Sequence, residues 1–316
     1  MNAPVVLFVY NRPEHTKKTV ESLRNNFGAS DTVLYIFSDA PRCQEDEVNV
    51  GLVRDYIKCI VGFKEVIIAE QVKNLGLADS IIGGVRGVCE KHGRVIVLED
   101  DIVTSKYFLD YMNEALDRYS DEERIMHISG YMFPINTNHI PESFLFRATT
   151  CWGWATWARA WKFFDRNTST IEGQFTKEKI YSFNIDGCND FWSHIKCNIK
   201  GEIKTWAIFW YATVFLNGGL CLHPAKSYVL NIGHDQSGVN CKENSHYEVE
   251  LASGHVQEWP EIIQEDPIAL DRIKKYHKKI NSVRYRIYNK IIRILIKQPG
   301  VWKFGIEVVP ENRTGC

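Results

Sequence analysis

The sequence predicts an α/β fold in which a mainly parallel sheet is covered by helices on both faces. Within the first hundred residues, four short apolar runs alternate with longer segments whose apolar residues recur at helical spacing. Alternation of this kind is typical of parallel strands joined by crossover helices. The chain has 316 residues, of which 45% are hydrophobic and 24% are charged, and this is enough to bury one large core.

The strands predicted in this half are apolar almost throughout, as expected of strands that are buried on both faces. They span residues 5–10, 32–39, 65–71 and 94–99. Helices are predicted between them over 12–26, 44–60 and 77–92. Pro13 marks the start of the first helix, and acidic residues in the first turn of the second suit the positive end of its dipole.

The second half is more aromatic and its elements are harder to assign. A helix is predicted over 105–119, with a strand following over 125–133. Residues 144–241 are expected to form a second lobe that completes a cleft, and helical character returns over 265–297.

Polar side chains are predicted to meet at one edge of the sheet, because ligands in such sheets bind beyond the carboxyl ends of the strands. Asn11 and Arg12 follow the first strand, Asp39 follows the second, and the acid run Glu99–Asp101 follows the fourth. Clustered carboxylates suit Mg²⁺ or Mn²⁺, and such a cation stabilises a leaving diphosphate. The alternative is helix capping, for which Thr104 and Ser105 are better placed.

The usual glycine-rich phosphate loops are missing from the sequence. Neither GxxxxGK[ST] nor a GxGxxG after the first strand occurs. A nucleotide would therefore be held by a metal ion and by side chains at the strand ends.

Four segments of the first half carry a family resemblance. The Asn-Arg-Pro turn, "SDAPR" (38–42), "NLGLADS" (74–80) and "VLEDD" (97–101) together resemble nucleotide-sugar glycosyltransferases of the GT-A fold. Residues 3–101 are similar to bacterial family 2-type transferases. The "EDD" form and the second half resemble the N-acetylglucosaminyltransferase I family, and the likeness extends to about residue 241.

This resemblance implies a role for each residue of the predicted edge. Asp39 would contact the nucleotide base, and Asn11 and Arg12 would line the nucleotide site. Asp101 would coordinate Mn²⁺ (or Mg²⁺), while Glu99 and Asp100 would contact the sugar and the ribose.

Two segments of the second half extend the resemblance. "CWGWATWARAW" (151–161) is similar to a Gly-x-Gly-Trp segment at the boundary of donor and acceptor. Trp154 is the predicted sugar contact, because the adjacent Gly153 permits close approach. Spacings of three and four among these tryptophans equally suit a helix face packed in the core. "NIGHDQSG" (231–238) resembles the loop that closes over the donor.

The sequence departs from the family at the catalytic base. "TWAIFW" (205–210) stands where the family has Trp-Asp-Asp-Trp, and neither Ala207 nor Ile208 accepts a proton. The candidates that remain are Asp235 and His234 in the closing loop, and Asp186 and Asp190 upstream. Asp235 is preferred because nearby glycines let the loop fold over a sugar, although an Asx turn would also explain it. His234 and His246 are further candidates for a nitrogen ligand to the metal.

A basic segment closes the chain. Between residues 272 and 297 it has ten Lys or Arg and no acid, with apolar residues at helical spacing. A basic amphipathic helix over 271–302 suits an anionic membrane surface, with Trp302 as an anchor. The alternative is a helix packed on the catalytic domain with a solvated basic face.

Taken together, these features predict a metal-dependent, inverting glycosyltransferase (hexosyl- or N-acetylhexosaminyltransferase). The donor is a nucleotide diphosphate sugar, with UDP expected, and the acceptor a saccharide or lipid-linked saccharide of bacterial surface polysaccharide or lipopolysaccharide synthesis. Residues 1–120 would bind the donor, 121–260 would form the acceptor half and closing loop, and 261–316 the basic helical tail. A catalytically inactive saccharide- or nucleotide-sugar-binding relative, or a sugar nucleotidyltransferase, is the alternative; the latter usually has a Gly-rich basic loop that "VYNRPEH" lacks.

The location and the excluded partners follow from composition. A net charge of −1 provides no field that favours nucleic acid. The nine cysteines are scattered, and residues 1–15 lack a charged leader with a long apolar run. We therefore expect a cytoplasmic protein with reduced thiols, peripheral at the inner face of the cell membrane.

Overall fold

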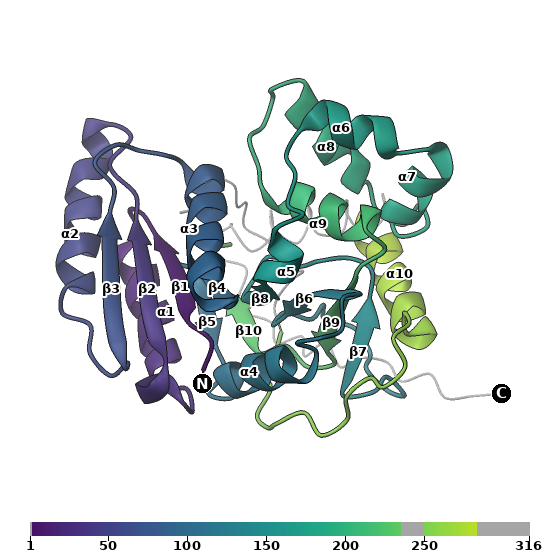
Figure 1. The fold of residues 1–316 in the computed structure, drawn as a ribbon, viewed down its shortest axis with the longest axis horizontal. Helices are drawn as coiled ribbons and strands as arrows, with labels where there is room; N and C mark the ends of the chain where they lie inside the picture. The colour runs from purple at the N-terminus through teal and green to yellow at the C-terminus, as the bar shows by residue number, and fades with distance from the viewer. Residues whose placement is uncertain (1, 235–248, 283–316) are drawn as a thin grey trace, which may run out of the picture.

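The computed structural model describes residues 2–234 and 249–282, and one large sheet runs through most of this chain (Figure 1). Its strands are β1 (Val5–Val9), β2 (Val33–Ser38), β3 (Glu65–Glu70), β4 (Arg94–Glu99), β6 (Ile125–Ser129), β7 (Ser143–Phe146), β8 (Trp154–Trp157) and β9 (Leu220–Pro224). Their order across the eight-stranded sheet is β3-β2-β1-β4-β8-β6-β9-β7.

The first half of the sheet is entirely parallel. β1 pairs with β2 on one side and β4 on the other, and β2 pairs with β3. In the second half, β6 and β9 are parallel, while β8 and β7 run antiparallel to their neighbours. The predicted α/β class is confirmed: this is a mainly parallel, GT-A-like sheet with helices on both faces.

The order of the strands creates a switch point between β1 and β4. The chain adds β2 and β3 on one side of β1 and then returns to add β4 on the other. The carboxyl ends of β1–β4 lie at the top of Figure 1, where the connection from β3 to the next helix also crosses. A switch point of this kind opens a crevice at the carboxyl edge.

Two layers of helices cover the sheet because its strands alternate their side chains between the faces. The helices of the first half are α1 (Pro13–Arg24), α2 (Glu47–Ile57), α3 (Leu77–His92) and α4 (Phe108–Arg118). Val5, Leu7 and Val9 join a core with α1, α2 and α4. Val6 and Phe8 point the other way and pack with α3.

The second half supplies helices to the same layers and a cluster of its own. They are α5 (Ala158–Trp161), α6 (Thr168–Gln174), α7 (Lys177–Phe183), α8 (Phe191–Ile199), α9 (Ala207–Leu216) and α10 (Pro267–Asn281). Phe183, Ile195 and Phe209 belong to a third buried cluster that joins these helices. Helices α6–α8 stand beyond the carboxyl edge of the sheet, at the top of Figure 1.

The predicted basic helix is described only up to its first third. In α10, Ala269 and Ile273 are buried in the third cluster and Tyr276 is also buried, while Lys275 and Lys278 face outward. This part therefore packs on the domain, as the alternative interpretation required. The membrane contact was predicted for 271–302, and residues 283–302 of this segment lie outside the described residues. Within the described ranges no helix is long and apolar enough to cross a bilayer.

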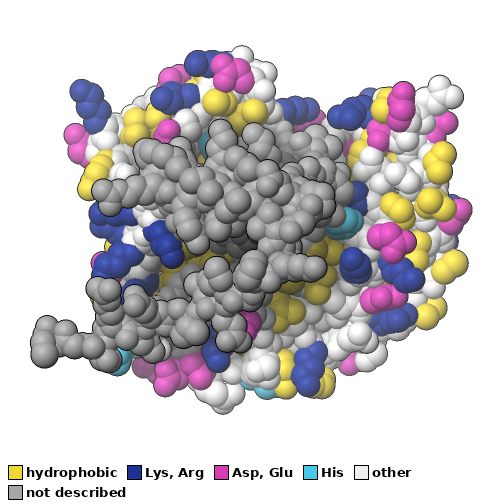
Figure 2. Space-filling model, turned by 180° about the vertical axis from the view of Figure 1, so that it is seen from behind, with side chains coloured by type: hydrophobic (Ala, Val, Ile, Leu, Met, Phe, Trp, Pro, Cys, Tyr) yellow, Lys and Arg dark blue, Asp and Glu magenta, His cyan; other side chains and the backbone are white. Residues whose placement is uncertain are grey.

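Charges are mixed on the surface of the molecule. On the face shown in Figure 2, acidic and basic side chains are interspersed over the described part of the surface. This distribution agrees with the net charge of −1.

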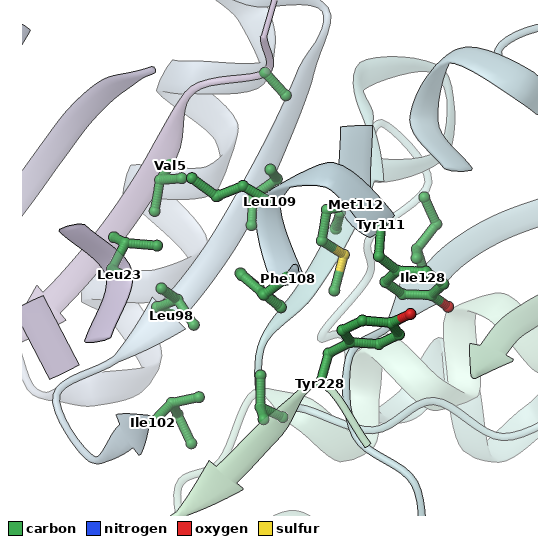
Figure 3. Packing of buried hydrophobic residues seen from close by; sticks show 14 of the residues in the cluster. Val5, Leu23, Leu98, Ile102, Phe108, Leu109, Tyr111, Met112, Ile128 and Tyr228 are labelled. Carbon is green, nitrogen blue, oxygen red and sulfur yellow. The ribbon is translucent and has the colours of Figure 1, made fainter. Parts of the chain in front are cut away.

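Part of the largest buried cluster is shown in Figure 3. Phe108 and Met112 of α4 project toward Leu98 and Ile128 of the sheet. The rings of Tyr111 and Tyr228 stack with centroids 4.6 Å apart. This packing fixes the backbone on which the polar residues of the edge are mounted.

Candidate functional site

The acid run Glu99–Asp101 lies at the switch point, between two buried anchors. Leu98 before it and Ile102 after it are 1% and 0% exposed, and both belong to the core of Figure 3. The Thr19 hydroxyl of α1 donates a hydrogen bond to the Asp100 carbonyl at 2.8 Å. The run is therefore held rigidly, although its side chains are acidic.

Arg12 reaches the acid run from the loop after β1. Its Nη2 donates to Asp100 Oδ1 and, at 2.9 Å, to Asp101 Oδ2. The two carboxylate side chains are 6% and 8% exposed, and that of Arg12 is 16% exposed. The structure thus brings together Arg12, Asp100 and Asp101, which the sequence predicted at one edge.

Burial disfavours the negative charge of the acid run. Loss of water, followed by the neighbouring carboxylates, raises the pKa of Glu99 to about 8. Desolvation likewise raises the pKa of Asp100 to about 6, against the opposing effect of Arg12. Burial alone would lower the pKa of Arg12, but Asp100 and Asp101 raise it well above its ordinary value. One guanidinium faces two buried aspartates and the half-buried Glu99, so another cation would be stabilised here.

The donor set of the run fits a hard divalent cation in part. Carboxylate oxygens are the ligands that Mg²⁺ and Mn²⁺ prefer. In the described part of the chain, no group of three or more His, Cys, Asp or Glu is arranged to hold a metal on its own. A cation here would therefore take its remaining oxygens from a ligand, as Mg²⁺ does when one or two carboxylates and phosphates hold it.

A short second sheet covers the acid run. Strand β5 (Ile102–Thr104) pairs antiparallel with β10 (Val229–Asn231), so the segment 231–234 meets the run directly. The backbone N–H of Ile232 donates to the Asp101 carbonyl at 2.9 Å. A Cβ atom at Gly233 would overlap the Asp101 carboxylate and lie 3.0 Å from Arg12 Nη1. Only glycine lets the backbone approach this closely.

Trp152 and His234 extend the site beside this roof. Their rings meet edge to face with centroids 5.3 Å apart, and Trp152 also packs edge to face on Tyr131. Trp152 is only partly buried. His234 was predicted from the sequence and is brought to the site, whereas Trp152 was not singled out.

Trp154 does not occupy the position predicted for it. Its side chain is 0% exposed and stacks on Trp206 with centroids 5.3 Å apart, with Trp161 and Trp210 beside it. Because β8 is covered on both faces, each of its four residues is buried. A ring without an exposed face offers nothing to a saccharide, so the core interpretation of these tryptophans describes Trp154.

Asp39 is buried at the end of β2 and organises the neighbouring loop. Its Oδ1 accepts the backbone N–H groups of Ala40 and Leu75, and its Oδ2 accepts that of Gly76, each at 2.9 Å. A cavity of about 110 Å³ lies beside it, lined in part by Phe37 and Gln71. The predicted contact of Asp39 with a nucleotide base remains a prediction.

The first loop is fixed by Asp46, a residue that the sequence did not point to. The Asn11 amide donates to Asp46 Oδ1 and the Tyr10 hydroxyl to Asp46 Oδ2, both at 2.6 Å. Asp46 ends the 3₁₀ helix Gln44–Asp46 before α2. The hydrogen bond from Tyr10, partly offset by burial, lowers the pKa of Asp46. Asn11 is therefore anchored to the loop after β2, and Arg12 follows from a fixed point.

The structure narrows the candidates for a catalytic base. Ile208 is 7% exposed and packs in the third cluster, so apolar side chains fill the positions where the family has acids. Asp190 caps α8 by accepting the N–H of Ser193. Asp186 pairs with Arg147 at 2.9 Å and with Lys274 at 2.8 Å. Of the two candidates in the closing loop, His234 lies at the site, while Asp235, like His246, lies outside the described residues.

Comparisons with known proteins add a likeness of fold. No family model matches the chain, and no curated protein sequence does. Among solved structures, a mannosyltransferase, PcManGT from Pyrobaculum calidifontis in complex with GDP-Man and Mn²⁺, matches with a TM-score of 0.40 and 10% identity over 68% of this chain and 70% of that one. S. aureus TarS matches with a TM-score of 0.39 and 11% identity over 72% of this chain, which spans 36% of TarS. At this level of similarity no reaction follows, so function rests on the residues of the site.

Proposed function

We propose that this chain is a glycosyltransferase that uses a divalent cation and a nucleotide diphosphate sugar. One observation carries the proposal: a rigid acid run with an arginine stands at the switch point between β1 and β4, under the segment 231–234. Ligands of parallel sheets bind at such a point, and a carboxylate-rich edge suits a metal-bound diphosphate.

The donor would lie across the carboxyl edge. Asp101 would hold Mn²⁺ or Mg²⁺ together with the diphosphate, and the bound cation would neutralise charge on the leaving group. Glu99 and Asp100 would face the sugar and ribose hydroxyls. The base, expected to be uracil, would enter the cavity beside Asp39.

The acceptor would be positioned beside Trp152. Sugars present apolar C–H faces, and a partly exposed aromatic ring provides a flat surface for them. Trp152 therefore replaces Trp154 as the proposed aromatic contact. Its neighbour His234 would take the proton of the acceptor hydroxyl in an inverting transfer, either itself or through Asp235.

The finer assignments follow from the sequence resemblance. We propose a hexosyl or N-acetylhexosaminyl donor and a saccharide or lipid-linked saccharide acceptor, in the synthesis of a bacterial surface polysaccharide. A lipid-linked acceptor would place the basic residues after 271 near an anionic membrane.

Release of the nucleoside diphosphate from UDP- and GDP-sugars tests this function. With Mn²⁺, the protein should release the nucleoside diphosphate slowly when water accepts the sugar, and faster when a saccharide acceptor is present. Asp101→Asn should reduce the rate by about 100-fold or more, because the charge that holds the cation is lost. Asp117→Asn is the matched control, since Asp117 pairs with Arg94 at the start of β4. Donor binding without any cleavage would instead indicate a non-catalytic relative, which the apolar Ala207 and Ile208 would suit.

A further inference from the structure

We propose that Arg12 is the resident counter-ion of the acid run, and that it moves to the donor's diphosphate when a divalent cation binds Asp101. This inference rests on the proposed function. It assigns to one side chain two successive anionic partners within the same site.

Arg12 already contacts the carboxylate to which the cation is assigned. A single nitrogen, Nη2, lies between one oxygen of Asp100 and one oxygen of Asp101. A divalent ion held by Asp101 would need the carboxylate that Arg12 contacts. The guanidinium and the ion would therefore compete for it.

The segment 231–234 packs closely on the Asp101 carboxylate and on the Arg12 guanidinium. The backbone at Gly233 lies against both Asp101 and Arg12, so close that even a methyl group would not fit. The Ile232 N–H donates to the Asp101 carbonyl, so this segment is tied to the run. An ion that binds the Asp101 carboxylate would therefore displace the arginine from it.

Charge gives the displaced guanidinium its next partner. With Arg12 alone, the run has three carboxyl groups to one cation, and His15 adds only a weaker favourable effect on Asp100. A divalent ion takes over two of these negative charges. The arginine is then available to a diphosphate, whose oxygens match its donors in geometry and charge.

The backbone of Arg12 permits this movement. Arg12 precedes the first turn of α1 with φ −118° and ψ 77°, and Asn11 behind it is anchored to Asp46. The base of the side chain is thus fixed, and 16% of the side chain is open to solvent. The proposed movement is a rotation of the Arg12 side chain about this base.

Titration with Mn²⁺ alone, by calorimetry, tests the first half of the inference. Arg12→Gln should bind Mn²⁺ about tenfold or more tightly than the unmodified protein, because a charge-assisted competitor is removed. Its melting temperature without metal should fall and be recovered by Mn²⁺. Arg12→Lys should lie between the two. Arg94→Gln is the control. Arg94 begins β4, at the opposite end of the strand from the acid run, and pairs with Asp117, so this variant should leave the Mn²⁺ affinity unchanged.

Titration with UDP and GDP at saturating Mn²⁺ tests the second half. Arg12→Gln should bind the preferred diphosphate about tenfold or more weakly, the opposite sign to its effect on Mn²⁺. The binding of the corresponding nucleoside should be unchanged. A merely structural role would weaken both ligands together.

Two results would overturn the inference. Unchanged or weaker Mn²⁺ binding by Arg12→Gln would show that Arg12 does not compete with the cation, and unchanged diphosphate binding would show that it is not transferred. Both are independent of catalysis. If the unmodified protein cleaves no donor, the proposed function fails, whatever Arg12 does to Mn²⁺.

Discussion

At the residue scale, the site depends on the absence of a side chain at Gly233. A Cβ there would overlap Asp101 Oδ2 and lie 2.9 Å from its Cγ. The position does not need a left-handed backbone, since Gly233 is not among the residues with positive φ. Space alone, and not conformation, requires glycine here.

Gly233→Ala should therefore impair the site without a general loss of folding. The added methyl must push Asp101 or the segment 231–234 aside, so the affinity for Mn²⁺ should fall by about tenfold. Gly254→Ala is the control, because a Cβ at Gly254 meets nothing within 4 Å. Equal Mn²⁺ affinity of the two variants would show that the close approach has no functional role.

The two neighbouring tryptophans should respond to truncation in opposite ways. Trp154→Ala should cost about 3–5 kcal/mol in the free energy of unfolding, because it empties the centre of a buried aromatic cluster. Trp152→Ala should cost much less and raise KM for the saccharide by about two- to tenfold. Urea denaturation and steady-state kinetics separate these effects. A destabilised Trp152→Ala with unaltered KM would count against Trp152 as a sugar contact.

At the element scale, the first half of the fold could be predicted and the second could not. Strands such as "VVLFV" and "RVIVLE" could be predicted from their apolar composition. The residues after them were predicted to lie together because parallel strands end at the same edge of the sheet. Trp152 was not predicted as a site residue because its position depends on the antiparallel pairing of β8 with β4. That pairing brings the segment before Trp154 to the carboxyl edge. No local pattern encodes that pairing. Asp46 was not predicted for a similar reason, because its partners Asn11 and Tyr10 lie 35 and 36 residues away in the sequence.

Helix α10 is held to the domain by a network around Arg147. Arg147 donates to Glu265, just before the helix, and to Asp186, which in turn accepts from Lys274 of the helix. Arg147→Met should destabilise the protein by about 2–4 kcal/mol, because it removes the guanidinium partner of the partly buried Glu265 and leaves Asp186 paired with Lys274 alone. Chemical denaturation measures this, with Arg118→Met at an exposed pair as control. A loss no larger than that of the control would show that the network does not anchor α10.

At the scale of the whole molecule, two sets of buried groups oppose each other in their dependence on pH. Burial lowers the pKa of His223 and of His277 to about 4, and that of His127 well below its ordinary value. Between about pH 6.5 and 4 the unfolded chain binds protons that the native state refuses, so stability falls as pH falls. Glu99 and Asp100, with raised pKa values, hold protons that the unfolded chain releases, so stability falls as pH rises toward about 8.

Without metal, the free energy of unfolding should therefore be greatest at slightly acidic pH, near 6.5. Urea denaturation at pH 5, 6.5 and 8 should show a loss of about 1 kcal/mol or more per pH unit on the acid side. His223→Gln should reduce that slope. Mn²⁺ should reduce the alkaline loss, because it stabilises the ionised carboxylates. A flat profile from pH 5 to 8 would mean that neither set is buried as described.

The proposed nucleotide diphosphate sugar would bind at the switch point together with a divalent cation. Thermal denaturation with UDP-, GDP-, CMP- and dTDP-sugars, with and without Mn²⁺, tests this binding most directly. At a concentration about 100 times its Kd, one donor should raise the melting temperature by about 5 °C, only when Mn²⁺ is present. Asp101→Asn should abolish that rise and Asp117→Asn should retain it. No rise with any donor, or an equal rise without Mn²⁺ or in Asp101→Asn, would contradict the account.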